Sequence, residues 1–393
     1  MDQGPRLSIP LEESKEVARL RSRVRDILAC LPDDYWRRHD AARTYPQEFI
    51  NTLTKSGLLA ILIPREYGGL GFGITEAAAV LEEINASGGN AGPAHAQMYV
   101  MGTILRHGSK EQKGHYLPAI ASGDLRLQAF AVTEPEAGSD SSRITTMAVR
   151  RGDRYVVTGR KIYISRVHHS DLMLLLARTS PRDESRPMAG LSTFLVDLRH
   201  AGNRLRLRPL RMMMNNETNE VEFDGLEVPV ENLIGEEGAG FRQILNGWNA
   251  ERILIAAECV GDGRWFVDRA ARYATERVVF DRPIGANQGV QFPIAAAYTQ
   301  VEAASLVQRR AAVRYDAGIP CGADANMAKY LAAEASWAAA NACLDTFGGN
   351  GFNAEHDVER KFRETRLYRV APVSNNLVLA FIGQRVLGMP RSY

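Results

Sequence analysis

The chain has 393 residues, of which 45% are hydrophobic and 24% are charged, and its formal net charge is +2 at pH 7. Such a composition is typical of a folded globular protein and argues against long disordered regions. The balanced charge gives no reason to expect a nucleic-acid or membrane surface. No apolar run in the sequence is long enough to span a bilayer.

The N-terminal third has helical periodicity. Apolar residues at helical spacing predict a helix over 16–31, which ends before Pro32. Three more helices are predicted, over 75–86, 94–106 and 110–122. The stretch YGGLGFG at 67–73 lacks the spacing of a phosphate-binding loop, so we expect a tight turn there.

The pattern changes after Leu125 to short apolar strands. Residues 154–165 are predicted to form a hairpin with Gly159 in its turn. Further strands are predicted over 172–177, 191–196 and 219–228. These segments indicate a compact β-domain.

Long Ala-rich helices are expected after Gly240, over 241–273, 291–315, 323–346 and 376–387. Their length and short connections favour an antiparallel bundle. The predicted fold is therefore an α+β multidomain protein. It has an N-terminal helical domain (1–125), a middle antiparallel β-domain (126–238) and a C-terminal four-helix bundle (239–393).

Several classes of chemistry are disfavoured by missing motifs. The sequence contains no HExxH, GxSxG or Walker motif, so metalloprotease, hydrolase and NTPase functions are not indicated. The four cysteines form no CxxC pair, which argues against a zinc site and fits a reducing compartment. The N-terminal MDQGPRLSIPLEESKE lacks the apolar core of an export signal, so we expect a cytoplasmic protein.

Seven segments, in order along the chain, resemble the acyl-CoA dehydrogenases. They are IPREYGGLG, AFAVTEPEAGSD, VTGRKIYIS, VPVENLIGEEGAGF, AERILIAAE, ERVVFDRPIGANQGVQF and DTFGGNGF, and the resemblance runs from about Gly57 to the C-terminus. It implies FAD-dependent α,β-dehydrogenation of an acyl-CoA thioester. It also implies a homotetramer that passes electrons to an electron-transfer flavoprotein, with no nucleic-acid or membrane partner.

The resemblance assigns residues to the cofactor and to the CoA. The cofactor residues are Phe130, Val132, Thr133, Tyr163, Ser165, Arg277, Phe280, Gln288, Asp345, Gly348, Gly349, Ser374 and Asn376, and the substrate residues are Ser139, Asn249 and Arg252. Small hydroxyl residues and backbone N–H groups can satisfy the polar rim of a flavin without covering its face. The same loop at 133–140 could instead be an ordinary surface turn, and Tyr163 a core aromatic.

The catalytic base is the point at which the chain departs from the commonest family pattern. Pro372 stands where most members have the catalytic Glu. In the branch that includes the isovaleryl and long-chain enzymes the base lies on a bundle helix, and Glu251 matches that position. We therefore predict that Glu251 removes the α-proton, with a pKa raised by burial. The alternative is a helix-surface acid paired with Arg252 or with a neighbouring chain.

Pro372 has a second consequence, because in the family the backbone N–H at that position polarises the thioester carbonyl. Proline has no N–H. The N–H of Val373 could substitute, a ribityl hydroxyl could act alone, or the thioester could be unusual. The loss also gives some weight to a flavin monooxygenase on this fold or a catalytically silent CoA- or flavin-binding subunit. The acyl group is not readable, although Met98, Tyr99, Met101 and the run 212–214 are candidates for its pocket.

Overall fold

The computed structural model describes residues 13–391, which form two compact units that interleave along the chain. The first unit contains the residues up to Asp40, Phe72–Ala91, and the residues from Asn249 onwards. The second contains Ala41–Gly71 and Gly92–Trp248. Each unit is therefore assembled from segments that are far apart in the sequence.

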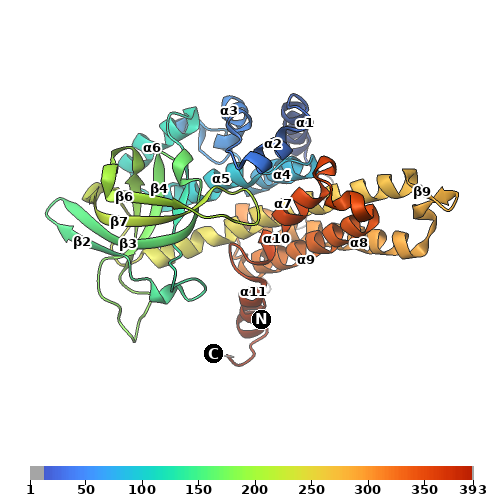
Figure 1. The fold of residues 1–393 in the computed structure, drawn as a ribbon. Helices are drawn as coiled ribbons and strands as arrows, with labels where there is room; N and C mark the ends of the chain where they lie inside the picture. Colours follow the sequence, from blue (N-terminus) through green and yellow to red (C-terminus); the bar gives the residue numbers. More distant parts are fainter. Residues whose placement is uncertain (1–12, 392–393) are drawn as a thin grey trace. The chain divides into compact units, whose positions relative to one another are not determined.

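The first unit is helical (Figure 1). Its helices are α1 (Lys15–Ala29), α2 (Tyr35–Ala42), α4 (Ile74–Ala86), α7 (Gly240–Glu276), α8 (Gln288–Asp316), α9 (Gly322–Phe347), α10 (Val358–Arg366) and α11 (Asn375–Phe381). The first residues of α7 belong to the second unit. The last predicted helix is shorter than expected as an α-helix, because a π-helical turn over Ile382–Val386 continues α11.

Polar contacts join the early helices of this unit to each other and to α8. Asp316, at the end of α8, accepts hydrogen bonds from the backbone N–H groups of Ile74 (2.8 Å) and Thr75 (2.9 Å), so it caps the start of α4. Arg21 of α1 forms ion pairs with Glu82 (3.1 Å) and Glu83 of α4. Helix α4 is thus fixed to α8, which lies more than two hundred residues further along the chain, and α1 is fixed to α4.

The second unit combines three helices with a sheet. The helices are α3 (Gln47–Lys55), α5 (Gly92–His107) and α6 (Lys110–Ser122). The strands are β1 (Leu127–Ala131), β2 (Met147–Arg151), β3 (Arg154–Ser165), β4 (Leu172–Arg178), β5 (Leu191–Asp197), β6 (Leu205–Pro209), β7 (Thr218–Pro229) and β8 (Leu233–Ile234). Among the described residues they form one sheet in the order β6-β7-β3-β2-β4-β5-β8, with β1 paired to β4. The sheet is mostly antiparallel, as predicted, but β1 and β2 each meet β4 in parallel.

The predicted hairpin over 154–165 is wrong. Those residues form the single long strand β3, and the turn is at Gly152 and Asp153, between β2 and β3. Gly159 lies within the strand with a φ of +150°, where a Cβ atom would come within 2.5 Å of the Thr146 hydroxyl oxygen. The glycine therefore marks a close approach inside the sheet, which is the other common reason for glycine in a strand.

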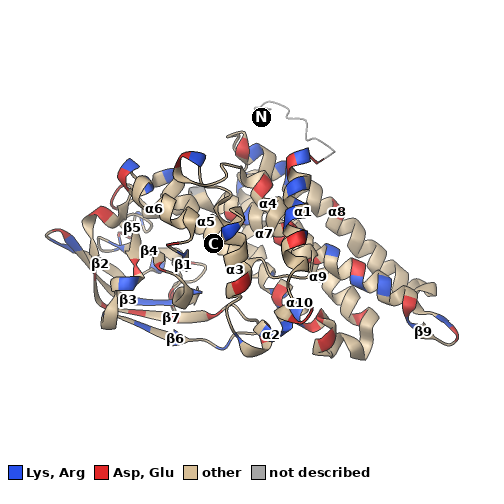
Figure 2. Ribbon diagram, turned by 90° about the horizontal axis from the view of Figure 1, so that it is seen from above, with Lys and Arg blue, Asp and Glu red and all other residues tan. Residues whose placement is uncertain are grey.

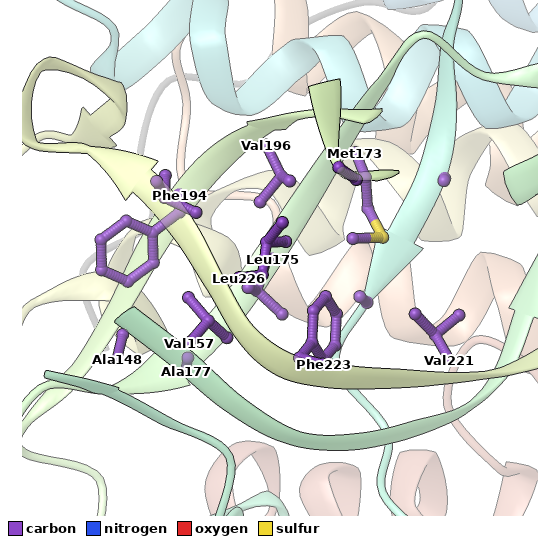
Figure 3. Close-up of a cluster of buried hydrophobic side chains, with 14 of the residues drawn as sticks. Ala148, Val157, Met173, Leu175, Ala177, Phe194, Val196, Val221, Phe223 and Leu226 are labelled. Carbon is purple, nitrogen blue, oxygen red and sulfur yellow. The ribbon is translucent and has the colours of Figure 1, made fainter. Parts of the chain in front are cut away.

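The inward face of the sheet forms a continuous apolar core (Figure 3). Strand β3 contributes Tyr155 and Val157 at alternate positions, and β4 contributes Met173 and Leu175. Phe194 of β5 packs edge-on against Tyr155, with 4.9 Å between ring centroids. This alternation fixes which side chains of each strand face outwards and can take part in a site.

Charged residues of both signs are interspersed along the elements of each unit (Figure 2). Many form surface pairs across neighbouring strands, such as Arg206 with Asp224 and Arg154 with Glu227. Within residues 13–391, no helix is long and apolar enough to cross a membrane.

Candidate functional site

The stretch AFAVTEPEAGSD leaves β1 as a loop organised by one buried carboxylate. Glu134 Oε2 accepts hydrogen bonds from the N–H (2.7 Å) and the hydroxyl (2.8 Å) of Thr145. Its Oε1 accepts from the N–H of Thr146 (3.0 Å) and from Lys161 Nζ (2.9 Å). The loop is therefore not an ordinary surface turn, because a charged group in its interior fixes the backbone.

Lys161 connects this loop to a bulge in β3. Besides Glu134, its ammonium group donates to the carbonyl of Val132 at 2.9 Å, and the N–H of Ile162 donates to the carbonyl of Thr133 at 2.9 Å. The pairing of β3 with β7 shifts register between Lys161 and Ile164. The two segments that the resemblance assigns to the flavin thus lie side by side.

The bulge turns an aromatic side chain outwards. Tyr163 has a φ of +63°, which non-glycine residues rarely adopt, and its side chain is 56% exposed. The interpretation of Tyr163 as a core aromatic is therefore wrong. Strained backbone that presents an exposed aromatic ring is common at ligand sites.

Aromatic side chains of α5 lie near the end of β1. Phe130 is half-buried and contacts Tyr99 of α5 edge-on, with 5.7 Å between centroids, and Tyr99 in turn contacts His95 at 5.0 Å. Met98 and Met101 of the same helix are fully buried, so α5 offers Tyr99 rather than these methionines at its partly open face.

A second buried charge fixes the chain just after Ser139. Arg178 of β4 donates to the carbonyls of Ser142 (2.7 Å), Ile144 (2.7 Å) and Pro187 (2.8 Å). Burial lowers the pKa of this arginine, and the neighbouring Arg182 adds to the effect. Ser139 itself is exposed at the surface of the loop.

These contacts give stability a defined pH dependence. Although burial opposes ionisation, Lys161 and the surrounding donors hold the pKa of Glu134 at about 2, below its ordinary 4.5. An acid with a lowered folded-state pKa stabilises the fold above its unfolded pKa and loses that effect as the pH falls towards 2. We expect this group to contribute about 3 kcal/mol at pH 6, of which about 2 kcal/mol is lost by pH 3.

Urea unfolding followed between pH 3 and pH 6 measures this contribution. The stability difference between the unmodified protein and Glu134→Gln should shrink as the pH falls, because only the former loses the ionised group. A difference that stays constant over this range would contradict the assigned pKa. Asp224→Asn, at an exposed carboxylate, is the control and should show no such trend.

In the helical unit, Glu251 lies on α7 and is only 6% exposed. Burial lowers the pKa of the adjacent Arg252, and the charge of Glu251 opposes this effect. Arg252 also donates to the side-chain oxygen of Asn249 at 3.3 Å. Glu251 is therefore not a helix-surface acid, and three of the four residues predicted for catalysis and substrate, Asn249, Glu251 and Arg252, lie together on one turn of α7.

The residues predicted for the distal half of the cofactor lie at the ends of long helices. Arg277 follows α7, and the short hairpin of β9 (Val278–Val279) and β10 (Arg282–Pro283) leads to α8, which begins at Gln288. Phe280 at the tip has a φ of +51° and is 94% exposed. This exposed apolar ring packs in no core of its unit. It is therefore suited to contact another molecule, such as a second copy of the chain or a ligand.

The GGNG loop after α9 lies against the same end of α7. Asn350 donates to the hydroxyl of Tyr273 at 2.9 Å, and Tyr273 stacks on Phe347 with 4.0 Å between centroids. Gly348 has a positive φ, and Asp345 is exposed. The structure therefore brings this loop and the end of α7 together within one unit.

The remaining cofactor positions lie at two other places in the fold. Ser165 hydrogen-bonds with Thr218 across the sheet at 3.1 Å. Ser374 caps α11 by accepting from the N–H of Leu377, and Asn376 in the first turn of α11 is exposed.

The residues offered for FAD match its chemistry. An isoalloxazine needs hydrogen-bonding groups beside an apolar face, and the segment 132–133 with its threonine hydroxyl and the exposed Tyr163 are of a kind suited to it. A pyrophosphate binds well to a guanidinium and to closely approaching backbone, and Arg277 and the glycine loop are residues of that kind.

Sequence reasoning missed Glu134, Lys161 and Arg178 as organising residues. For Lys161 a signal existed: with Tyr155, Val157 and Gly159 it occupies the inward positions of an alternating strand. A lysine in such a position requires a buried partner.

Comparison with known proteins agrees with these features. Three family models match in order: the acyl-CoA dehydrogenase N-terminal domain at residues 14–124, the middle domain at 129–226 and the C-terminal domain at 238–387. The acyl-CoA dehydrogenase FadE12 of Mycobacterium tuberculosis is 36% identical over 97% of this chain and 98% of its own.

Two glutaryl-CoA dehydrogenases are similar as well. That of Desulfococcus multivorans is 33% identical over 96% of this chain and 98% of its own. A solved glutaryl-coenzyme A dehydrogenase in complex with glutaryl-CoA has a TM-score of 0.90 and 30% identity, with 98% of each chain covered. The chain belongs to the acyl-CoA dehydrogenase family of FAD-binding oxidoreductases.

Proposed function

We propose that this protein is an acyl-CoA dehydrogenase in which Glu251 removes the α-proton of the thioester. The observation that carries the proposal is the burial of Glu251 beside Arg252 on α7. A carboxylate shielded from water is a stronger base towards a weakly acidic C–H group than a hydrated one. FAD, when bound, supplies the acceptor for the β-hydride.

The chain's own residues bind and orient the reactants. Phe130, Val132, Thr133, Tyr163 and Ser165 hold the flavin and ribityl part, and Lys161 fixes the Val132 carbonyl beside them. The distal part of the cofactor is held by Arg277, Phe280, Gln288, Asp345, Gly348, Gly349, Ser374 and Asn376. Ser139, Asn249 and Arg252 contact the substrate.

A second copy of the chain is part of the proposal. Besides Phe280, the helix α8 exposes Phe292, Tyr298 and Leu306 at spacings of six and eight residues. Large apolar side chains that are exposed along one helix are typical of a subunit interface. We propose a homotetramer in the cytoplasm that passes its electrons to an electron-transfer flavoprotein.

Anaerobic titration of the purified FAD-containing protein tests the function. Addition of its acyl-CoA substrate should bleach the flavin absorbance near 450 nm, and a panel of thioesters of different length and branching would identify the acyl group. Because Pro372 lacks the usual N–H donor, the titration has two other possible outcomes. Oxygen consumption by the reduced protein without any response to acyl-CoA would indicate a monooxygenase, and FAD binding with neither response would indicate a silent binding subunit.

A further inference from the structure

Two glycines lie in the interior of helices where close packing does not require them. Gly247 is in α7 and Gly102 is in α5, and glycine within a helix is unfavourable relative to alanine. Among residues 13–391, outside its own helix neighbours, a Cβ atom on Gly247 would meet only the Thr103 hydroxyl oxygen, at 4.0 Å, and one on Gly102 would meet nothing within 4 Å. Both glycines are nevertheless half-buried. Each therefore has open space beside it.

Other helical glycines show that this combination is unusual in the chain. A Cβ atom on Gly261 of α7 would lie 2.2 Å from the carbonyl oxygen of Glu82, so the close approach of α4 requires glycine there. Gly114 of α6 has open space as well, but it is exposed, so solvent fills that space. At Gly247 and Gly102 a methyl group would fit without displacing any described atom. A helical glycine without a packing reason points to a function.

Aromatic rings border the open positions. Tyr99 is one turn before Gly102 on α5 and shares its face, and the Tyr99 ring contacts Phe130 with 5.7 Å between centroids. Phe130 and Trp248, the residue after Gly247, pack against the same buried cluster. Since Gly247 faces Thr103, the residue after Gly102, both open positions lie where α5 meets the start of α7. Half-buried rings around a space are typical of a site for an apolar ligand.

The predicted base lies on the same face of α7 as one of these glycines. Gly247 is four residues before Glu251, a separation of about 6 Å along the helix axis. A base must come within about 3 Å of the group whose proton it removes. An α-carbon placed at Glu251 therefore has its other substituents close to Gly247. The helix is open at the position where a branch or ring on the α- or β-carbon would lie.

We propose that Gly247 and Gly102 are specificity-determining residues that make room for an acyl group which is branched or cyclic next to its thioester carbonyl. A linear acyl chain is narrow and does not need this width, whereas a ring that contains the α- and β-carbons does. The rings of Tyr99 and Phe130 can pack against the faces of such a group. This inference rests on the proposed function and adds the class of substrate to it.

Two thioesters with the same number of acyl carbons, the cyclic cyclohexanecarbonyl-CoA and the linear heptanoyl-CoA, test the inference by anaerobic bleaching of the FAD-containing protein. We expect the unmodified protein to have the higher kcat/KM for the cyclic thioester. Gly247→Ala should lower that value by about 10–200-fold, the effect of one added methyl group in a fitted pocket, and the linear value by less than about threefold. Gly102→Ala should act in the same direction. The Tm of both variants should equal or exceed that of the unmodified protein, since alanine favours a helix and fits here.

Gly114→Ala is the matched control, because it makes the same change at an exposed helix position that also has open space. It should leave both kcat/KM values unchanged. Gly261→Ala should instead lower the Tm, because its methyl group would collide with the Glu82 carbonyl. The four variants together distinguish a glycine that leaves room for a ligand from one that allows helices to pack.

The other outcomes would overturn the inference. Equal losses for the cyclic and the linear thioester in Gly247→Ala would assign the open space to the CoA arm. An unchanged preference in Gly247→Ala and Gly102→Ala, with a changed oligomeric state in gel filtration or without one, would also contradict it. A preference of the unmodified protein for heptanoyl-CoA would do so while the proposed function stands. Failure of every thioester to bleach the unmodified protein would overturn the function itself, and the inference with it.

Discussion

Glu251→Gln is expected to abolish reductive bleaching by acyl-CoA, with a fall of at least 10³-fold in its rate, while FAD remains bound. The amide keeps the shape of the buried side chain but cannot accept the α-proton at neutral pH. Stopped-flow absorbance under anaerobic conditions measures the rate. The flavin spectrum and the ratio of FAD to protein measure the retention of the cofactor.

The matched control is Asp268→Asn, which makes the same chemical change at an exposed acid of the same helix. Its bleaching rate should stay within twofold of that of the unmodified protein. Retention of more than a tenth of the rate in Glu251→Gln would show that the base lies elsewhere. Loss of FAD along with activity would point instead to a disturbed fold.

Lys161→Met is expected to lower the free energy of unfolding by about 3–5 kcal/mol, because it leaves the Glu134 carboxylate buried without its cation. Burial lowers the pKa of Lys161 to about 8, and the carboxylate opposes that effect. The ammonium group therefore remains mostly charged at pH 7. The same variant should weaken FAD binding, since the Val132 carbonyl loses its donor. Urea unfolding and FAD titration of the apoprotein measure the two effects.

The double variant Glu134→Gln with Lys161→Met distinguishes the energetic effect of an unpaired buried charge from the effect of lost side-chain packing. Removal of both charges should recover at least half of the lost stability, because no isolated charge then remains buried. Arg206→Met provides the surface comparison: its pair with Asp224 is exposed on both sides and should contribute less than about 1 kcal/mol. A similar loss of unfolding free energy in Lys161→Met and Arg206→Met would contradict the expected difference between a buried and an exposed ion pair.

Local patterns predicted much of the secondary structure. Helical periodicity gave α1, α4 and the long helices α7 to α9, whose ends lie within a few residues of the predicted ones. The alternation in 219–228 likewise predicted most of β7. A helix depends on side chains three or four positions apart, and a strand on side chains two positions apart. Both spacings can be read directly from the sequence.

Contacts between distant residues were not predictable in the same way. Gly159 was placed in a turn because a strand glycine is ambiguous until its neighbour, Thr146, is known. The pairs of Glu134 with Lys161 and of Lys329 with Val373 span 27 and 44 residues and follow only from the packed fold. For the candidate site, the burial of Glu251 is confirmed by the structure, whereas its role as the base stays a prediction.

The interleaving of the two units has a consequence for synthesis of the chain on the ribosome. The sheet and its three helices are complete once residue 248 has emerged, but α1 and α4 must then wait for α7 to α10 before their apolar faces are covered. A nascent chain stalled after the sheet would expose those faces to chaperones and to aggregation. A truncation that removes the last helices should therefore also prevent the stable packing of α1 and α4.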